Sequence, residues 1–284
     1  MRFSRVLRAG ALVAATSLAL AACGGGGDDE GGNGGGGGEG GSGDSLTIGI
    51  KFDQPGLGQQ TPDGYEGFDV DVATYIAKEM GVSEDSIEWK ETPSAERENM
   101  IDNGDVDFIV ATYSITDERK ERVSFAGPYY IAHQDLLVRQ DDSAITGPDS
   151  LNGKKLCSVS GSTSAQRVKD EYAQQVDLLE YGGYSECLTA LENGQVDAIT
   201  TDDVILAGLA AANPGKFKVV GEGFSDENYG VGIPKGDAEL QTQINDAITK
   251  MFEDGAWKAA IDKHLGPAGF EAPEPPEITE TSAS

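Results

Sequence analysis

Basic residues are scarce in this chain. Its 284 residues include 21 Lys and Arg against 49 Asp and Glu, which gives a formal net charge of −28 at pH 7. Nucleic-acid binding and binding to an anionic membrane face both need basic surface, so this charge argues against both functions. The simplest interpretation of so many acidic side chains is a well-solvated, exported protein.

Histidines and the common catalytic motifs are scarce as well. The two histidines, His133 and His264, lie far apart in the sequence. There is no P-loop, no His-Glu-x-x-His motif and no closely spaced cysteine cluster. We therefore expect no metal, no cofactor and no catalytic activity. A dehydratase or hydrolase with a buried general acid in its cleft is the enzyme alternative.

No apolar run is long enough to cross a membrane comfortably, and the nearest to it lies at the N-terminus. Arg2, Arg5 and Arg8 precede GALVAATSLALAA, which has the length of a signal-peptide core. The run ends in Leu-Ala-Ala-Cys, the pattern of a bacterial lipobox. We expect residues 1–22 to be a lipoprotein signal peptide and Cys23 to carry the lipid. Ordinary secretory cleavage beside an incidental cysteine is the alternative.

Both ends of the chain lack the residues of a core. Residues 23–44 are mostly glycine with a few acids, which is typical of a flexible tether, and about 20 such residues span roughly 25 Å. Residues 268–284 are rich in Pro and Glu and are expected to be disordered. We expect an extracytoplasmic monomer that a lipid on Cys23 holds close to the cell membrane.

Cysteine is the next scarce residue, with three in the chain. If Cys23 carries a lipid, Cys157 and Cys187 are left. In an oxidising compartment such a pair usually forms a disulfide, and two cysteines without a nearby histidine make a poor zinc site. A bridge across this loop would stabilise the fold by about 3–4 kcal/mol in the chain-entropy model.

The chain is rich in alternating strand and helix patterns. LTIGIKF reads as a first strand, and Phe68, Val72, Ile76 and Met80 then form one stripe of a helix. The patterns DSIEWKET, SAERENMIDNG and VDFIVAT continue as strand, helix and strand. This alternation predicts an α/β fold with a largely parallel sheet.

One sequence pattern occurs twice. Residues 100–109 read MIDNGDVDFI and residues 190–199 read ALENGQVDAI, each a helix end followed by Asn-Gly and the entry to a strand. The match predicts two α/β lobes of related build, unless two helix ends agree by chance.

Two extended apolar segments flank the second half of the repeat. DLLVRQ (135–140) and YGVGIPK (229–235) are interpreted as the crossing strands of a hinge. The first lobe would then comprise residues 45–138 and 228–267. The second lobe would comprise residues 139–227 and hold both remaining cysteines.

The repeat also marks where a ligand is expected, because open α/β sheets bind ligands at the carboxyl ends of their strands. In the first lobe, Ser114 and Arg119 follow VDFIVAT, with Thr116 as a helix N-cap. In the second lobe, Asp202 and Asp203 follow the matching strand. Arg for a carboxylate and Asp for an ammonium together describe an α-amino acid. An ordinary solvated helix start and an N-cap are the alternatives.

Six segments resemble the polar amino-acid-binding proteins of ABC importers, solute-binding protein family 3. They are GFDVDVATYIAKEMG, NGDVDFIVATYSITDERKERVSFAGPYY, LNGKKLCSVSGSTSA, NGQVDAITTDD, YGVGIPKGDAEL and DGAWKAAIDKHLG. Further segments, IGIKFDQPGLG, CSVSGSTSAQRVKDEY and AITTDDVILAG, are most similar to the glutamate-binding lipoproteins of actinobacterial importers. The resemblance covers nearly all of residues 46–266. It implies a bilobal periplasmic-binding-protein fold of type II, with two α/β lobes and a two-strand hinge.

The resemblance also implies roles for single residues. Thr112 replaces the family's glycine, whose carbonyl accepts from the ligand ammonium. Ser114 replaces a threonine that contacts both ends of the ligand. Arg119 would bind the α-carboxylate through its planar fork, and Asp202 would bind the ammonium. The family's Gly-Thr-Thr loop corresponds to a Gly-Ser-Thr loop ending in Thr163, which would give a backbone N–H to the carboxylate.

The pocket for the ligand side chain rests on fewer residues. Lys51 follows the first strand, where neutral-amide binders of the family carry an acid, so it favours a γ-carboxylate. Arg97 is a second candidate, and Ser160 and Thr201 would add hydroxyls. A solvated lysine and a helix-surface ion pair are the alternatives for the two cations.

The function expected from these features is capture of an acidic L-amino acid by lobe closure, with glutamate favoured over aspartate. The partners would be an ABC permease and its ATPase subunits. A glutamine or asparagine binder, and an amino-acid sensor subunit, are the alternatives.

Overall fold

The computed structural model describes residues 45–172, 176–221 and 223–283. The predictions for the signal peptide, the tether and the lipidated Cys23 lie outside these residues. The described residues belong to one compact unit. Within them, no helix is both long enough and apolar enough to cross a membrane.

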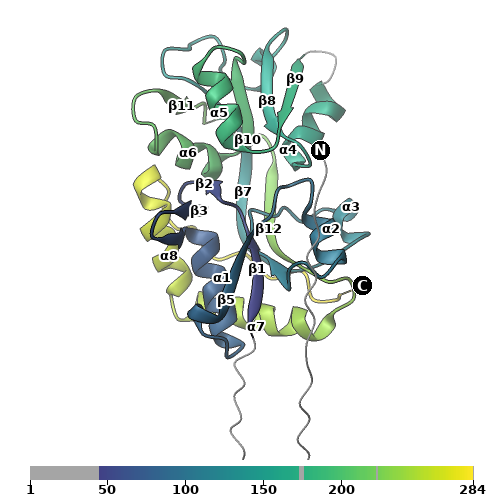
Figure 1. The fold of residues 1–284 in the computed structure, drawn as a ribbon. Coiled ribbons are helices and arrows are strands. Elements are labelled where there is room, and N and C mark those ends of the chain that lie inside the picture. The colour runs from purple at the N-terminus through teal and green to yellow at the C-terminus, as the bar shows by residue number, and fades with distance from the viewer. Residues whose placement is uncertain (1–44, 173–175, 222, 284) are drawn as a thin grey trace, which may run out of the picture. The chain divides into compact units, whose positions relative to one another are not determined.

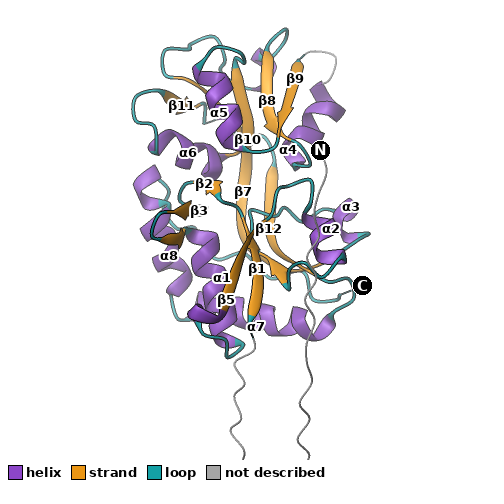
Figure 2. Ribbon diagram, in the orientation of Figure 1, coloured by secondary structure: helices purple, strands orange, loops and turns teal. Residues whose placement is uncertain are grey.

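Figure 1 shows the order of the elements, and Figure 2 shows helices on both sides of the strands. The strands are β1 (Leu46–Ile50), β2 (Asp53–Gln54), β3 (Gly58–Thr61), β4 (Gly64–Glu66), β5 (Ile87–Glu91), β6 (Phe108–Ile109), β7 (Ser124–Arg139), β8 (Lys155–Val159), β9 (Asp177–Tyr181), β10 (Ala198–Asp202), β11 (Phe217–Val219) and β12 (Asp226–Ile233). The helices are α1 (Phe68–Glu79), α2 (Arg97–Asp102), α3 (Asp117–Lys120), α4 (Thr163–Arg167), α5 (Tyr184–Glu192), α6 (Asp203–Ala211), α7 (Ala238–Glu253) and α8 (Ala256–His264), besides four short turns of other helix types.

A nine-stranded sheet runs through the molecule in the order β5-β1-β6-β12-β7-β10-β8-β9, with β11 paired to β7. The outer strands on each side are parallel, whereas β12 and β7 are antiparallel to their neighbours. We use lobe 1 for the elements built on β1, β5 and β6 with α1, α2, α3, α7 and α8, and lobe 2 for those built on β8, β9 and β10 with α4, α5 and α6.

Two long strands join the lobes. β7 pairs with β12 through Ser124 to His133 and then with β10 through Gln134 to Val138. It therefore leaves one lobe and enters the other without a break, beside β12 (Figure 1). The predicted crossing segment DLLVRQ is the second half of β7, and YGVGI is the second half of β12. The residue boundaries of the lobes stay a prediction.

The repeated pattern has the same structural role in both lobes. Gly104 and Gly194 end α2 and α5 with positive φ angles of 69° and 70°, the left-handed conformation that glycine adopts most easily. Asp107 then accepts from the backbone N–H of Thr47 at 2.7 Å, and Asp197 accepts from that of Lys155 at 2.8 Å. In each lobe the Val-Asp of the repeat thus fixes the start of the neighbouring strand.

The first helix follows its sequence pattern. Phe68, Val72 and Ile76 are fully buried, and the helix ends at the residue before Met80. Gly81 has a φ of 85°, as expected for the residue after a helix C-cap. The stripe packs against α7 and α8, so lobe 1 is completed by the last two helices of the chain.

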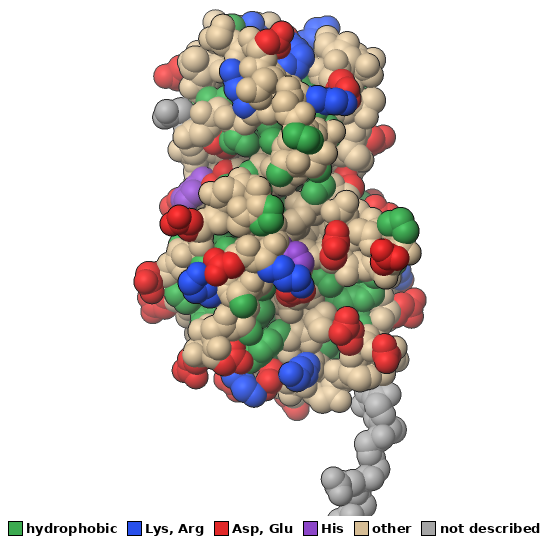
Figure 3. Space-filling view, turned by 90° about the vertical axis from the view of Figure 1, so that its left-hand side faces the viewer, with side chains coloured by type: hydrophobic (Ala, Val, Ile, Leu, Met, Phe, Trp, Pro, Cys, Tyr) green, Lys and Arg blue, Asp and Glu red, His purple; other side chains and the backbone are tan. Residues whose placement is uncertain are grey.

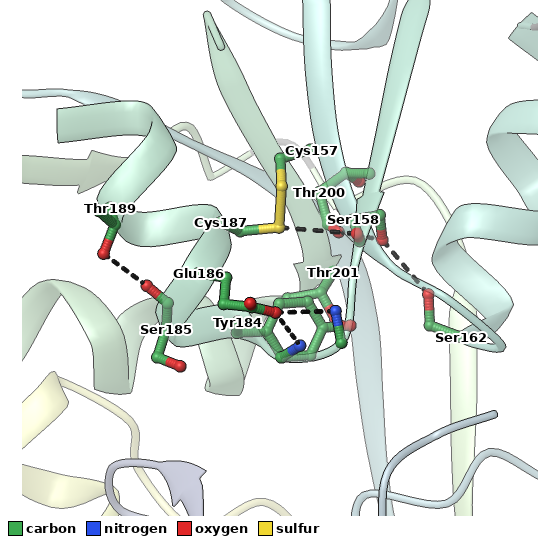
Figure 4. The surroundings of a disulfide bond; sticks show 12 residues. Cys157, Ser158, Ser162, Tyr184, Ser185, Glu186, Cys187, Thr189, Thr200 and Thr201 are labelled. Carbon is green, nitrogen blue, oxygen red and sulfur yellow. Dashed lines mark hydrogen bonds between the residues drawn. A yellow bond between two sulfur atoms is a disulfide. The ribbon is translucent and has the colours of Figure 1, made fainter. Parts of the chain in front are cut away.

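The predicted disulfide is confirmed. Cys157 in β8 is bonded to Cys187 in α5, with their Cα atoms 5.6 Å apart. Figure 4 shows that the bridge joins the underside of α5 to the strand that leads into Ser162. The bond therefore ties together two segments of lobe 2 that face lobe 1.

The C-terminal tail differs from the expectation of disorder. Residues 269–283 form no helix or strand, yet Phe270, Ala272 and Ile278 pack against the core. The backbone N–H groups of Thr279 and Glu280 both donate to the carbonyl of Gly127 in β7. The tail is therefore an extended segment laid along lobe 1.

Candidate functional site

A small cavity of about 10 Å³ lies where the carboxyl ends of the central strands of both lobes meet. A cavity of this size can hold about one water molecule, so the side chains themselves fill most of the site. The lining residues come from both lobes and are mostly polar: Gln54, Ser94, Arg97, Thr112, Ser114, Arg119, Ser162, Thr163, Ser164, Tyr184, Thr201, Asp202 and Ile205.

Arg119 joins the two lobes. Thr116 caps α3 and accepts from the backbone N–H of Arg119, which is the third residue of that helix, as predicted. The guanidinium donates to the carbonyl of Ser114 in lobe 1 at 2.6 Å and to that of Gly161 in lobe 2 at 2.9 Å. Glu98 lies 3.5 Å from its Nε. The two terminal nitrogens of Arg119 are thus held by backbone oxygens from both lobes, and the Glu98 carboxylate lies beside Nε.

Asp202 presents one unbonded oxygen to the cavity. Its Oδ2 accepts from the hydroxyl of Tyr229 at 2.6 Å, whereas the buried Oδ1 has no hydrogen-bond partner. Burial, and secondarily the carboxylate of Glu227, raise the pKa of Asp202 to about 8. The side chain does not cap α6, although Asp202 occupies the N-cap position. Asp203 is the first residue of α6 and therefore not its N-cap.

Arg97 supplies the matching unbonded donor. One terminal nitrogen donates to the carbonyl of Ala111 at 2.9 Å, and the guanidinium lies 4.1 Å from the centre of the Tyr113 ring. Its Nε is buried without a partner, and burial together with Arg119 lowers the pKa of Arg97 to about 10. Within the described ranges, Arg97 Nε and Asp202 Oδ1 are the buried side-chain polar atoms that lack a hydrogen bond. One is cationic, one is anionic, and both residues line the same cavity.

The predicted hydroxyls gather at the lobe boundary. Ser114 Oγ and Thr163 Oγ1 lie 3.4 Å apart, one from each lobe. Thr201 donates to the hydroxyl of Tyr184 at 2.5 Å beneath α5 (Figure 4). These groups already have partners in the protein, and they are placed to exchange them for a polar ligand.

Thr112 holds an unusual backbone conformation in the site. Its φ of 46° is in the left-handed region, which β-branched residues rarely adopt. The backbone N–H donates to the buried Asp69 at 2.9 Å, and the hydroxyl is within 3.2 Å of Gln54 Oε1. Buried hydrogen bonds therefore hold the strained residue in place.

Two predicted residues lie outside the cavity lining. Ser160 is held through its backbone to Tyr181, and its side chain does not line the cavity. Lys51 is 3% exposed, and no hydrogen bond or ion pair joins its ammonium group to the described residues. Burial, with the positive charge of Arg97, lowers the pKa of Lys51 to about 8. The structure thus places a second buried cation near Arg97, outside the cavity lining.

The site also contains residues that the sequence did not single out. Gln54 ends strand β2 and Ser94 lies in a loop of lobe 1, whereas Tyr184 and Ile205 come from helices of lobe 2. Gln54 follows Lys51 by three residues, and Tyr184 opens α5 directly after a Gly-Gly pair, so proximity to strand ends was the available signal. Their inward direction depends on tertiary packing.

An open pocket of about 480 Å³ continues from the cavity toward solvent and shares Ser94, Arg119, Ser162 and Thr163 with it. Its charged lining is balanced and consists of Arg119, Arg122, Arg167, Lys169, Glu98, Glu118, Asp170 and Glu171. We call this pocket the mouth of the site, because it adjoins the cavity and is open to solvent.

Comparison with known proteins gives a consistent result. Residues 46–267 match the sequence model of the bacterial extracellular solute-binding proteins, family 3. A glutamate-binding protein GluB of Corynebacterium efficiens is 47% identical over 93% of this chain and 92% of its own length. The GluB of Corynebacterium glutamicum is 48% identical over 91% and 90%. The glutamine-binding protein GlnH of an ABC transporter of Bacillus subtilis is 38% identical over 78% and 81%.

Solved structures agree with the fold. An ancestral arginine-binding protein bound to arginine superimposes with a TM-score of 0.73 at 34% identity, covering 78% of this chain and 98% of that one. A solute receptor for L-cysteine of Neisseria gonorrhoeae gives a TM-score of 0.74 at 30% identity, covering 79% and 91%. The expected two-lobe fold of type II is confirmed, and the chain belongs to the bacterial extracellular solute-binding proteins of family 3.

Proposed function

We propose that this protein captures an acidic L-amino acid, glutamate before aspartate, as the substrate-binding protein of an ABC importer. The observation that carries the proposal is the pair of unsatisfied buried groups, Arg97 Nε and Asp202 Oδ1, on one cavity between two lobes. Buried polar atoms normally have partners, because leaving one unpaired costs about 1–3 kcal/mol. An acidic amino acid would supply both partners at once, its ammonium to Asp202 and its side-chain carboxylate to Arg97.

The main chain of the ligand fits the groups at the lobe boundary. Asp202 would accept from the α-ammonium, together with the hydroxyl of Ser114 and the carbonyl of Thr112. Arg119 would exchange its carbonyl partners for the α-carboxylate, which binds a guanidinium fork in bidentate fashion. Thr163 would add a backbone N–H from lobe 2. Because these contacts come from both lobes, the ligand favours the closed state.

The side chain of the ligand meets an excess of positive charge. Arg97 and Lys51 are both buried, and the positive charge of Arg97 contributes to the lowered pKa of Lys51. Among the described residues, no carboxylate lies within hydrogen-bond distance of either cation. A second carboxylate on the ligand would relieve this arrangement. The names of the two GluB relatives support glutamate, and that of GlnH supports glutamine as the alternative.

The cellular setting follows from the same proposal. The N-terminal pattern supports a lipid on Cys23, which would hold the protein at the outer face of the cell membrane. A permease and its ATPase subunits would receive the ligand. A sensor subunit that reports the amino acid to a membrane kinase would need the same site.

Calorimetric titration with glutamate, aspartate, glutamine and asparagine tests the ligand class. We expect micromolar or tighter binding of glutamate, which corresponds to about −8 kcal/mol or more. Arg119→Ala should cost about 3–5 kcal/mol of binding, because it leaves a buried carboxylate unpaired. Unchanged affinity in that variant would refute the clamp, and turnover of any of the four ligands would favour the enzyme alternative.

Lys51→Ala tests the side-chain pocket. Removing the buried ammonium should lower the preference for glutamate over glutamine by about tenfold, because only glutamate carries a side-chain charge that this nearby cation attracts. Lys90→Ala is the matched control, since Lys90 lies on the neighbouring strand β5 with an exposed side chain paired to Asp105. An equal loss for both ligands would assign Lys51 a structural role instead.

A further inference from the structure

Helix α5 has no side-chain cap of its own. Its N-cap residue is Gly183, which has extended backbone angles and no side chain to accept from the first helical amides. Glu186 accepts from the N–H groups of Gly182 and Gly183 at 2.9 and 3.2 Å, so it serves the residues before the helix. The amide of Ser185, the second residue of the helix, is left for another partner.

That partner comes from the opposite lobe. Asp53 in β2 accepts from the backbone N–H of Ser185 at 3.3 Å, and its Oδ2 is 3.4 Å from the Ser185 hydroxyl. An N-cap side chain normally accepts from the second or third helical N–H, so Asp53 makes the bond of an N-cap residue. A Cβ added to Gly183 would lie 2.6 Å from Asp53 Oδ2. The lobe 1 carboxylate thus occupies the space where a lobe 2 cap would begin.

The capped turn is part of the ligand cavity. Tyr184, the first residue of α5, lines the cavity and bonds to Thr201. On the lobe 1 side, Asp53 is followed by Gln54, which lines the same cavity. The disulfide at Cys187 holds the next turn of α5 against β8 (Figure 4). The position of α5 is therefore fixed, and closing the lobes brings its uncapped end onto Asp53.

Next to this bond, the backbones of the two lobes also lie in close contact. A Cβ added to Gly208 in α6 would lie 2.1 Å from the carbonyl oxygen of Pro55. Residues 53–55 of lobe 1 therefore contact lobe 2 at Gly183 and Gly208. Because glycine has no side chain, the two lobes can come this close together.

We propose that Asp53 caps helix α5 across the cleft, and that this bond exists only when the lobes are closed. Asp53 is then a positioning residue that stabilises the closed state without touching the ligand. The proposal rests on the proposed function, because closure is what ligand binding exploits. Loss of a cap typically corresponds to about a fivefold change in an equilibrium, and affinity should change by the same factor.

Asp53→Ala tests the bond directly. Affinity for glutamate should fall about fivefold, and the Ser185 amide should lose protection against hydrogen exchange in the ligand-bound protein. Asp53→Asn should keep most of the glutamate affinity and most of the Ser185 protection, because asparagine caps helices as well as aspartate does. Asp63→Ala is the matched control, since it removes the same charge from an exposed turn between β3 and β4, which form one three-stranded sheet with β2. Wild-type affinity and protection in Asp53→Ala would overturn the proposal.

Gly183→Ser separates capping from general stability. Serine fits the extended backbone of this position and would cap α5 from within lobe 2, while its Cβ would displace Asp53. The melting temperature should therefore rise or hold, whereas glutamate affinity should fall about fivefold. Ser185 protection should also become independent of ligand. A variant that loses stability and affinity together, with Ser185 unprotected, contradicts the proposal.

The two proposals fail in different ways. If the wild-type protein binds none of the four amino acids, the proposed function fails. Exchange of the Ser185 amide in ligand-free wild-type and Asp53→Ala protein still tests the cap. If glutamate binds but Asp53→Ala behaves as Asp63→Ala does, the cap fails and the proposed function stands.

Discussion

Asp202 is the single residue whose ionisation should control ligand binding. Its buried carboxyl group has one oxygen bonded to Tyr229 and one oxygen free, and its pKa is raised to about 8 by burial and by Glu227. At pH 7 the ligand-free closed site therefore holds a neutral acid, whereas an ammonium needs the carboxylate. Binding must release the proton.

This release gives affinity a defined pH dependence. Below pH 8, glutamate affinity should rise with pH, by up to about tenfold per unit, as Asp202 ionises. Above pH 8 the rise should stop and the affinity should fall, because Lys51 then loses its positive charge. In the ligand-free protein the effect on stability has the opposite sign. The unfolded chain ionises Asp202 above about pH 4 and the native protein does not, so the free energy of unfolding falls as pH rises to about 8.

Calorimetric titrations at pH 7 in two buffers of different protonation enthalpy measure the release. We expect up to about one proton per glutamate in the wild type and none in Asp202→Asn. A wild-type titration without proton exchange would show that Asp202 is already ionised before the ligand arrives.

Single residues also mark the limit of what the sequence predicts. Arg119 was found from its place after a strand end, and Thr116 from its N-cap pattern. The direction of the Lys51 side chain was not predictable from the sequence. A side chain at the end of a strand can point into the cavity or away from it, and only tertiary packing decides which. The left-handed conformation of Thr112 was hidden as well, since threonine disfavours it and Asp69 enforces it through tertiary bonds.

At the scale of elements, local patterns predicted the helices and strands that have strong periodicity. The apolar stripe from Phe68 to Ile76 predicted helix α1. The repeated pattern predicted the two strands that begin directly after Asp107 and Asp197. The C-terminal tail shows why composition alone fails. Its Pro and Glu content favours disorder, but Phe270, Ala272 and Ile278 alternate with exposed acids at the period of an extended chain.

Removing residues 270–284 tests the role of this segment. The truncation exposes the core beneath Phe270 and Ile278 and leaves the carbonyl of Gly127 without its two donors. We expect a loss of about 2 kcal/mol in the free energy of unfolding, or about 4–8 °C in melting temperature. Thermal denaturation followed by circular dichroism measures it.

The control is a variant confined to the ion pair of the tail. Glu280→Ala removes the partly exposed contact with Lys120 but keeps the backbone bonds, so stability should change by under about 1 kcal/mol. Glutamate affinity should hold in both variants, because the tail packs away from the cavity-lining residues. A truncated protein as stable as the full chain would mean that the tail does not hold lobe 1 together.

At the scale of the whole molecule, the charge of the protein opposes the charge of its proposed ligand. The chain carries −28, and acidic side chains are spread over the face shown in Figure 3, with Lys and Arg beside them. The mouth of the site does not compensate, because its four basic residues face four acidic ones. The long-range field of the protein should therefore repel an anion until it comes close to Arg119 and the buried cations Arg97 and Lys51.

This repulsion predicts an unusual salt dependence for an acidic ligand. Raising the ionic strength from 10 to 150 mM shortens the Debye length from about 30 to 8 Å, so the association rate of glutamate should rise, by roughly threefold. Stopped-flow tryptophan fluorescence measures the rate. Glutamine is the control, because its net charge is zero and the far field exerts no net force on it. If the glutamate rate falls with added salt while the glutamine rate stays constant, the mouth of the site attracts anions and local charge outweighs the field of the whole protein.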